Sequence, residues 1–180
     1  MPNWCQNDLQ LTGQIKVLKP IIENALKNNG LFNAIIPMPE ELSTNDNIMS
    51  KEQQESNCSK YGHYDWFCWR LANWSTKWDT DISDSYSLME LEADTMNKSP
   101  DDEITIHLYF DTAWSPPIAV YQALEEINIQ VLGYYYEPGC AYCGWYEDGY
   151  DSCNSFSGYD DIPSDILAVF GIEKDDFIEE

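Results

Sequence analysis

A cluster of tryptophans constrains the fold of this chain more than any other feature of its sequence. The segment WFCWRLANWSTKWDT contains four of the chain's seven tryptophans, Trp66, Trp69, Trp74 and Trp78. On a helix, side chains three or four positions apart share a face, and each indole buries roughly 150 to 250 Å². We therefore expect this segment to form the second layer of a hydrophobic core, with Arg70 and Lys77 close enough to stack on indole rings. A base-stacking platform is the alternative, but it requires surrounding positive charge that this chain lacks.

The size and composition of the chain predict one folded domain. The chain has 180 residues, of which 43% are hydrophobic and 14% aromatic. Folded domains most often have about 100 to 150 residues, and disordered acidic chains are poor in aromatics. We therefore expect a single domain over residues 1–180, with an acidic C-terminal extension from about residue 148.

The net charge of −23 is distributed unevenly along the chain. Up to Lys77 there are eight acidic and seven basic residues, so that part is close to neutral. From Trp78 onward the remaining 24 acidic residues face only Lys98 and Lys174, which gives a net charge of −22. Solubility of a small domain requires a net charge of roughly 2 to 8. The later part of the chain therefore carries more negative charge than solubility requires.

This charge and the first residues restrict the possible classes of function. A strongly negative field repels nucleic acid and anionic membranes and attracts cationic surfaces, so we expect no direct nucleic-acid binding. The start, MPNWCQNDLQLTG, has no basic region or apolar run, and no later segment approaches the ~20 apolar residues of a membrane span. We expect a cytoplasmic protein without a membrane partner, in which the six cysteines are thiols or metal ligands.

The periodicity of apolar residues predicts the order of the elements. Alternation predicts strands, and a three-to-four-residue period predicts helices. Strands are expected over residues 7–12, 31–37, 128–139 and 140–149, together with a hairpin near 86–112. Helices are expected over 15–30, 115–127 and in the tail from 163, whereas 40–60 is expected to be a loop or a loose helix. This order suits an α+β sandwich with helices on one face of a mainly antiparallel sheet.

Five ordered motifs carry a resemblance to a known family. They are MPNWCQNDLQLTG, IIPMPEEL, YGHYDWFCWRLANWSTKWD, FDTAWSPPIAVYQAL and YYYEPGCAYCGWY, which together span roughly residues 1–147. In these motifs the chain resembles the YubB ferredoxin-like family, whose members are phage-, plasmid- and island-encoded bacterial proteins. The resemblance implies a ferredoxin-like fold and residence on a mobile element, and it implies no catalytic residues. Ser75 stands where that family usually has glycine, and the cysteines of CAYC and the acidic tail also depart from its pattern.

Possible metal sites carry weak signals. Cys140 and Cys143 have the spacing of a zinc knuckle, with Cys153 as a third ligand and Cys58, Cys68, His63 or His107 as a fourth. A structural zinc site normally shows a second closely spaced pair, so we favour ordinary buried cysteines. The carboxylates of 79–84 and 148–161 lack the spacing of an EF-hand loop. We therefore expect no cofactor, no metal and no catalytic residue.

The leading hypothesis is a non-enzymatic binding protein of a phage or mobile element. Its carboxylates would mimic nucleic-acid phosphates and occupy a basic groove of a host protein, as in an anti-CRISPR or anti-restriction inhibitor of a defence nuclease. The expected partner-binding residues are Asp79, Asp81, Asp84, Glu90, Glu92, Asp94, Asp101, Asp102, Glu103, Glu147, Asp148, Asp151, Asp160 and Asp161.

Two alternatives belong to other classes of function. One is an interaction or assembly protein that uses an apolar patch around the tryptophans or a self-dimerising sheet edge. The other is a small hydrolase or metal-dependent enzyme with an acidic pocket, although no phosphate-binding glycine loop or nucleophile elbow is present.

Overall fold

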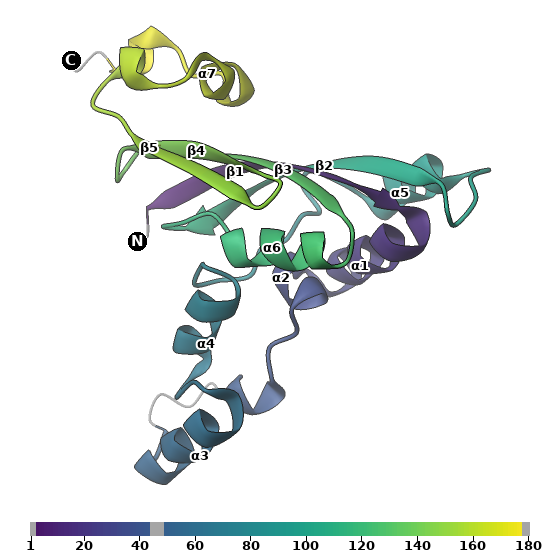
Figure 1. Ribbon diagram of the computed structural model, residues 1–180, viewed down its shortest axis with the longest axis vertical. Coiled ribbons are helices and arrows are strands. Elements are labelled where there is room, and N and C mark those ends of the chain that lie inside the picture. Colours follow the sequence, from purple (N-terminus) through teal and green to yellow (C-terminus); the bar gives the residue numbers. More distant parts are fainter. Residues whose placement is uncertain (1–2, 44–48, 178–180) are drawn as a thin grey trace.

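The computed structural model describes residues 3–43 and 49–177. Within these ranges it shows an α+β fold around a five-stranded antiparallel sheet with the strand order β2-β1-β3-β4-β5 (Figure 1). The strands are β1 (Trp4–Gln14), β2 (Glu103–Ala113), β3 (Gln130–Glu137), β4 (Tyr142–Glu147) and β5 (Tyr150–Ser155). The prediction of an α+β fold with a mainly antiparallel sheet is confirmed.

The helices form a layer on one face of this sheet and an arm beyond it (Figure 1). The layer contains α1 (Ile15–Asn28), α2 (Leu31–Ile35), α5 (Leu88–Thr95) and α6 (Ile118–Glu126). The arm contains α4 (Trp66–Asn73), the 3-10 turn Glu40–Leu42 and, farthest from the sheet, α3 (Lys51–Tyr61). The opposite face carries only the C-terminal cap, residues 156–177, with α7 (Ser164–Phe170) and the 3-10 turns Tyr159–Asp161 and Lys174–Phe177.

Strand β1 is an interior strand of the sheet, between β2 and β3. Leu9 and Leu11 point toward the helical layer, where Leu18 and Ile22 of α1 complete a buried cluster. Both β2 and β3 run antiparallel to β1, and α6 joins them across it. Strand β1 is therefore held on both sides by segments that are distant in sequence.

The strongest periodic signals give elements close to those predicted. The strand predicted over 7–12 is the middle of β1, which extends beyond it at both ends, to Trp4 and Gln14. The helices predicted over 15–30 and 115–127 are α1 and α6, and the last two predicted strands are β3 and β4. The strand β5 was not predicted, because its sequence is mostly polar.

The prediction of a strand over residues 31–37 is wrong. Residues 31–35 form α2, whose first backbone amides are held by a segment distant in sequence. Asp79 accepts hydrogen bonds from the amides of Phe32 at 2.7 Å and Asn33 at 3.0 Å, and the Leu31 amide donates to the Thr80 carbonyl. Carboxylates bind well at helix N-termini, so this contact outside the segment outweighs its strand propensity.

The first half of the predicted hairpin near 86–112 is also wrong. Residues 88–95 form α5, and only the second half is a strand, β2. Ser87 and Glu90 form a reciprocal capping box at the start of α5. Leu91 is buried while Met89 is exposed, so the alternating pattern of this segment does not correspond to alternating burial.

The prediction that the tryptophan segment forms a core layer is confirmed for Trp69 and Trp74, whereas Trp66 and Trp78 are only partly buried. Trp69 and Trp74 are buried and meet edge to face with ring centroids 5.7 Å apart. The Arg70 guanidinium lies 5.1 Å from the ring of Trp66 and 4.9 Å from that of Trp74. After this helix Ser75 takes a φ of 63°, in the left-handed region that favours glycine.

The C-terminal cap has a core of its own. Tyr136 and Cys143 on the sheet pack with Phe156, Ile162 and Ile166 of the cap. The helix predicted in the tail is confirmed as α7, but it lies on the face opposite the other helices (Figure 1). The expectation of helices on one face therefore holds for the helical layer and is wrong for α7. In the segment 40–60, part of the expected loose helix is α3, and residues 44–48 lie outside the described residues.

Candidate functional site

The candidate site is the open face of the sheet, the part opposite the helical layer that the cap leaves uncovered (Figure 1). In β1, residues 5, 7, 9, 11 and 13 are buried toward the helices, so the even-numbered residues face the other way. The cross-strand register places the odd-numbered residues of β2 and the even-numbered residues of β3 on that same face. The strands that the structure describes contain no lysine or arginine.

Carboxylates from several elements meet on the open face. Asp8 on β1 lies directly opposite Tyr109 of β2 and Tyr134 of β3. The negative charges of Asp165, Glu147 and Asp8 add to desolvation in raising the pKa of Tyr134 above its ordinary value. Carboxylates of β1, β4 and α7 are therefore near enough to Tyr134 to raise its pKa.

The strand residues at the rim of this face extend the same charge. Asp111 and Glu103 on β2 point to the open face, because they pair with Gln6 and Gln14 of β1. Partial burial raises the pKa of Asp111, and it raises that of Asp8, although the nearby His107 opposes the effect on Asp8. Asp8 is partly exposed to solvent and Asp111 is exposed.

A shallow hollow of about 230 Å³ lies on the open face. Gln10 and Thr12 of β1, Leu132 of β3 and the pair Glu147 and Asp148 line it. The hollow is polar and open to solvent, so it suits contact with a macromolecular surface better than enclosure of a small substrate.

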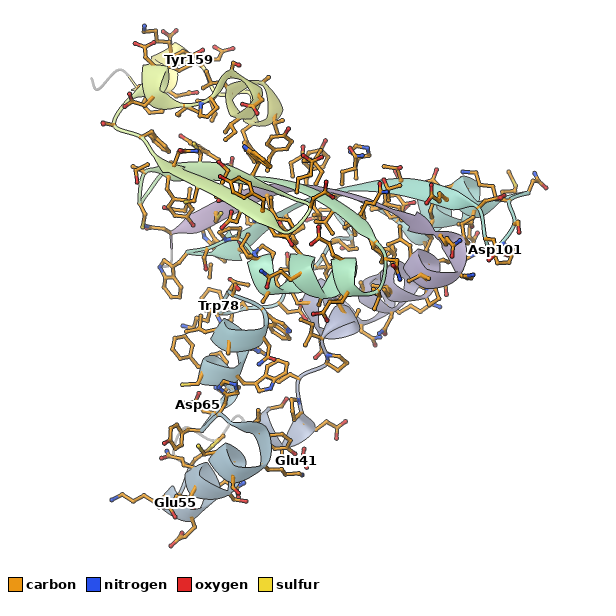
Figure 2. The ribbon with its side chains drawn as sticks, in the orientation of Figure 1. Glu41, Glu55, Asp65, Trp78, Asp101 and Tyr159 are labelled. Atoms are coloured by element: carbon orange, nitrogen blue, oxygen red, sulfur yellow. The ribbon has the colours of Figure 1, made fainter. Side chains whose placement is uncertain are left out.

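Many of the predicted partner-binding carboxylates have local structural partners. The Asp79 carboxylate is half-buried and accepts the amides at the start of α2, and the Asp94 carboxylate accepts the Tyr86 hydroxyl. The others in this group accept turn amides, cap a helix, accept a hydroxyl or pair with lysine: Asp81, Glu90, Asp101, Asp102, Asp151, Asp160 and Asp161. Labelled Asp101, paired with Lys16, lies at the tip of the turn before β2 (Figure 2).

The remaining predicted residues are exposed and have no side-chain hydrogen bond or ion pair within residues 3–43 and 49–177. They are Asp84, Glu92, Glu103, Glu147 and Asp148. Glu103, Glu147 and Asp148 lie on or beside the open face, whereas Asp84 and Glu92 lie before and within α5, in the helical layer. The structure thus brings together only part of the predicted set.

Sequence reasoning missed three carboxylates of the open face, Asp8, Asp111 and Asp165. The first two alternate with buried residues in β1 and β2, so the period-two pattern was a signal that could have placed them on the face opposite the core. Asp165 reaches this face only because the cap folds back over the sheet, and no local pattern indicates that.

The cysteines are arranged as separate thiols. Cys143 is buried and Cys140 is exposed, so the CxxC pair does not point into one site. Burial raises the pKa of Cys143 to about 11 and that of Cys5 to about 12. Within the described part of the chain, no three histidine, cysteine or acidic side chains are grouped as metal ligands, which leaves the predicted zinc and calcium alternatives without a site there.

A second surface, the aromatic cluster, lies at the end of the sheet where β1 begins. It consists of Trp4, Phe67, Trp78 and Trp114 around Lys77. Trp4 is 46% exposed, Trp114 42% and Phe67 37%. Figure 2 shows Trp78 on the side of the molecule away from Asp101. The acidic turn before β2 and the aromatic cluster therefore lie at opposite ends of the sheet.

Comparisons with protein-family models, curated proteins and solved structures found no match to this chain. No helix in the described ranges combines the length and apolar character needed to cross a bilayer.

Proposed function

We propose that the protein is a non-enzymatic inhibitor that presents its open face to a cationic groove of a nucleic-acid-binding protein. One observation carries the proposal: Asp8 of β1 and Glu147 of β4 project from the sheet face that the helical layer leaves uncovered, and α7, which carries Asp165, lies on the same side of the sheet. A groove that normally holds phosphates is lined by lysine and arginine, and a rigid anionic surface attracts it over long range.

The absence of basic side chains from the strands supports this proposal. Asp8, Glu103, Asp111 and Glu147 share the open face with polar and aromatic groups, and the strands described contain no lysine or arginine to neutralise them. Neighbouring strands lie about 4.8 Å apart, so β2 and β4 lie about 14 Å apart across the sheet. Their carboxylates are also offset along the strands, because Glu103 is level with Gln14 of β1 and Glu147 is level with Gln10. A rigid array of this width resembles a phosphate backbone more closely than flexible acidic loops do.

The finer fold assignment is part of the same proposal. The unit β2-α6-β3 around β1 follows the arrangement of a ferredoxin-like fold, and in chain order α2 stands where such a fold has its remaining strand. We infer a ferredoxin-like sandwich that lacks this strand and gains β4 and β5 at the other edge. With the YubB-like motifs, this supports an origin on a phage or other mobile element and action inside a bacterial host on a defence nuclease.

The test is competition with DNA for a defence nuclease, either a restriction enzyme or an RNA-guided nuclease. The protein is expected to displace labelled duplex DNA, with inhibition that weakens steeply as salt rises from about 50 to about 200 mM, because salt screens the attraction between the two charged surfaces. The double variant Glu103→Lys and Glu147→Lys is expected to lose inhibition. The control, Glu52→Lys and Glu55→Lys on α3, makes the same change in net charge at exposed positions of the arm.

The two variants distinguish an effect of the open face on inhibition from an effect of the net negative charge. If the α3 control loses as much inhibition as the open-face variant, net charge rather than the open face is responsible. If inhibition is absent, or insensitive to both salt and charge reversal, the proposal is wrong.

The aromatic cluster supports a second candidate function, self-assembly. Exposed Trp4 and Trp114 form an apolar surface of a kind that often marks an interface. Sedimentation over a range of protein concentrations tests this. A concentration-dependent dimer that Trp4→Ser disrupts would support assembly, and a monomer at all concentrations would exclude it.

A further inference from the structure

We infer that a groove between the start of α6 and the β4-β5 hairpin holds an arginine side chain of the partner protein. The groove has a volume of about 340 Å³, and its principal lining residues are Trp114, Pro116, Ile118, Tyr135, Tyr142 and Asp151. The inference rests on the proposed function, because it assigns one contact of that partner.

The groove exists because β4 and β5 extend beyond the helical layer. Tyr135 of β3 lies opposite Gly144 of β4, and its side chain crosses that glycine toward β5. The Tyr135 hydroxyl donates a hydrogen bond to Asp151 at 2.6 Å. Because Asp151 pairs with Tyr146, whose side chain is in the main core, Asp151 points to the helix side of the sheet. A carboxylate therefore lies at one side of an aromatic groove.

The hydrogen-bonding groups of the groove favour a cation. The Tyr142 hydroxyl donates to the Trp114 carbonyl at 2.5 Å, and the Ser115 hydroxyl donates to the Ser75 carbonyl at 2.6 Å. Both hydroxyl protons are thus already engaged in hydrogen bonds within the protein. Asp151 accepts the Tyr135 hydroxyl through Oδ1, and within the residues described its Oδ2 has no donor. The groove therefore offers a free acceptor, Asp151 Oδ2, beside apolar ring surface. A positively charged donor can bind the acceptor and pack against the rings.

The shape of the groove favours arginine over lysine. A guanidinium is planar, is less strongly hydrated than an ammonium group and stacks on aromatic rings while it donates to a carboxylate. The chain already uses the stacking part of this contact internally, where the Arg70 guanidinium lies against the rings of Trp66 and Trp74. The nucleic-acid groove of the proposed partner supplies arginine, so the charge of the occupant complements that of Asp151.

The position of the groove fits a partner that covers the open face. Glu147 and Asp148 lie at the turn of the same β4-β5 hairpin that supplies Asp151. β5 is an edge strand, so a partner on the open face reaches the groove by passing one strand. The groove and the open face therefore lie on the two sides of the sheet and adjoin at the β5 edge.

The test uses short peptides and the full-length protein. The probe is acetyl-Gly-Arg-Gly-amide, and its neutral analogue has citrulline in place of arginine. In NMR titrations, the arginine peptide is expected to give saturable shifts of the Trp114 indole signal, and the citrulline peptide is expected to bind at least about tenfold more weakly, since hydrogen bonds to charged groups are the stronger ones.

A pair of isosteric variants tests the role of Asp151. Asp151→Asn is expected to weaken binding of the arginine peptide about tenfold, because it removes the charge and keeps an oxygen that can accept the Tyr135 hydroxyl. Asp148→Asn removes the same charge on the same hairpin but outside the groove lining, and it is expected to leave binding within about twofold, since it makes no contact with the bound peptide. Circular dichroism verifies that both variants are folded.

Each contrary outcome overturns the inference in a recognisable way. It fails if no saturable shift occurs, if citrulline binds as well as arginine, or if the two asparagine variants lose affinity equally. If the arginine peptide does not bind but salt-dependent nuclease inhibition is preserved, only the assignment of the groove is wrong. If the peptide binds but the protein does not inhibit the nuclease, the proposed function is wrong and the groove is still a cation-binding site.

Discussion

At the scale of single residues, Asp79 shows that a carboxylate in an acid-rich segment can have a structural role. Asp79 belongs to the acid-rich later part of the chain, yet it is half-buried and accepts three backbone amides, those of Phe32, Asn33 and Thr80. Sequence reasoning placed it on a binding surface, because charge counts do not distinguish a carboxylate that faces solvent from one that caps a distant helix. Desolvation raises its pKa, and the three amides and Arg70 oppose the effect.

We predict that Asp79→Ala destabilises the protein. The substitution leaves backbone amides at the start of α2 without an acceptor, and each unpaired buried donor costs about 1 to 3 kcal/mol. The free energy of unfolding, measured in urea, is expected to fall by at least that amount. Asp84→Ala, at an exposed position, is the control and is expected to change it by less than about 0.5 kcal/mol. Equal losses in the two variants would contradict the capping role.

At the scale of elements, the alternation of apolar and polar residues identified strands where one face of the strand is buried and the other is polar. β1 and β2 have one buried and one polar face, and their pattern was sufficient to find them. The segment 87–94 has a similar pattern but begins with a capping box, and the local hydrogen bonds of Ser87 and Glu90 fix a helix there. The strand β5 has no apolar pattern, since it is a polar edge that pairs with β4 alone.

We predict that Gly144→Ala disrupts the β4-β5 hairpin. A Cβ at this position would overlap the Ser152 carbonyl and the Tyr135 ring, and neither has room to move in a paired strand. Overpacking typically costs about 1 to 3 kcal/mol. The melting temperature is expected to fall by several degrees, and amide exchange should accelerate in β5 first. Gly158→Ala is the control, because a Cβ there meets no atom within 4 Å. An unchanged melting temperature in Gly144→Ala would contradict the tight packing.

At the scale of the whole molecule, two cores lie on opposite faces of one sheet. The main core joins the sheet to the helical layer, and the smaller one joins Tyr136 and Cys143 to the C-terminal cap. Sequence reasoning found the tail helix and the acidic character of this region, but not the face on which it packs. That choice depends on the fit of Phe156 and Ile166 against the sheet, a contact between segments that local periodicity does not encode.

We predict that the cap detaches without unfolding the rest of the protein. Ile166→Asp places a charge in the smaller core, where it has no partner, and burial of an unpaired charge costs several kcal/mol. Hydrogen exchange is expected to become fast over residues 156–177 and to remain slow in β1 and β2. Ala168→Asp adds the same charge at an exposed position of α7 and should leave the cap protected. Global unfolding by Ile166→Asp would show that the two cores form one cooperative unit.

The absence of lysine and arginine from the strands has a consequence for experiments on this protein. Between Lys98 and Lys174 there is no cleavage site for trypsin, so digestion releases four of the five strands within a single large peptide. Amine-reactive dyes and cross-linkers attach to the lysines of the helices and turns, and no strand that the structure describes offers them a side-chain amine. A fluorescently labelled preparation therefore keeps the sheet surface chemically unmodified.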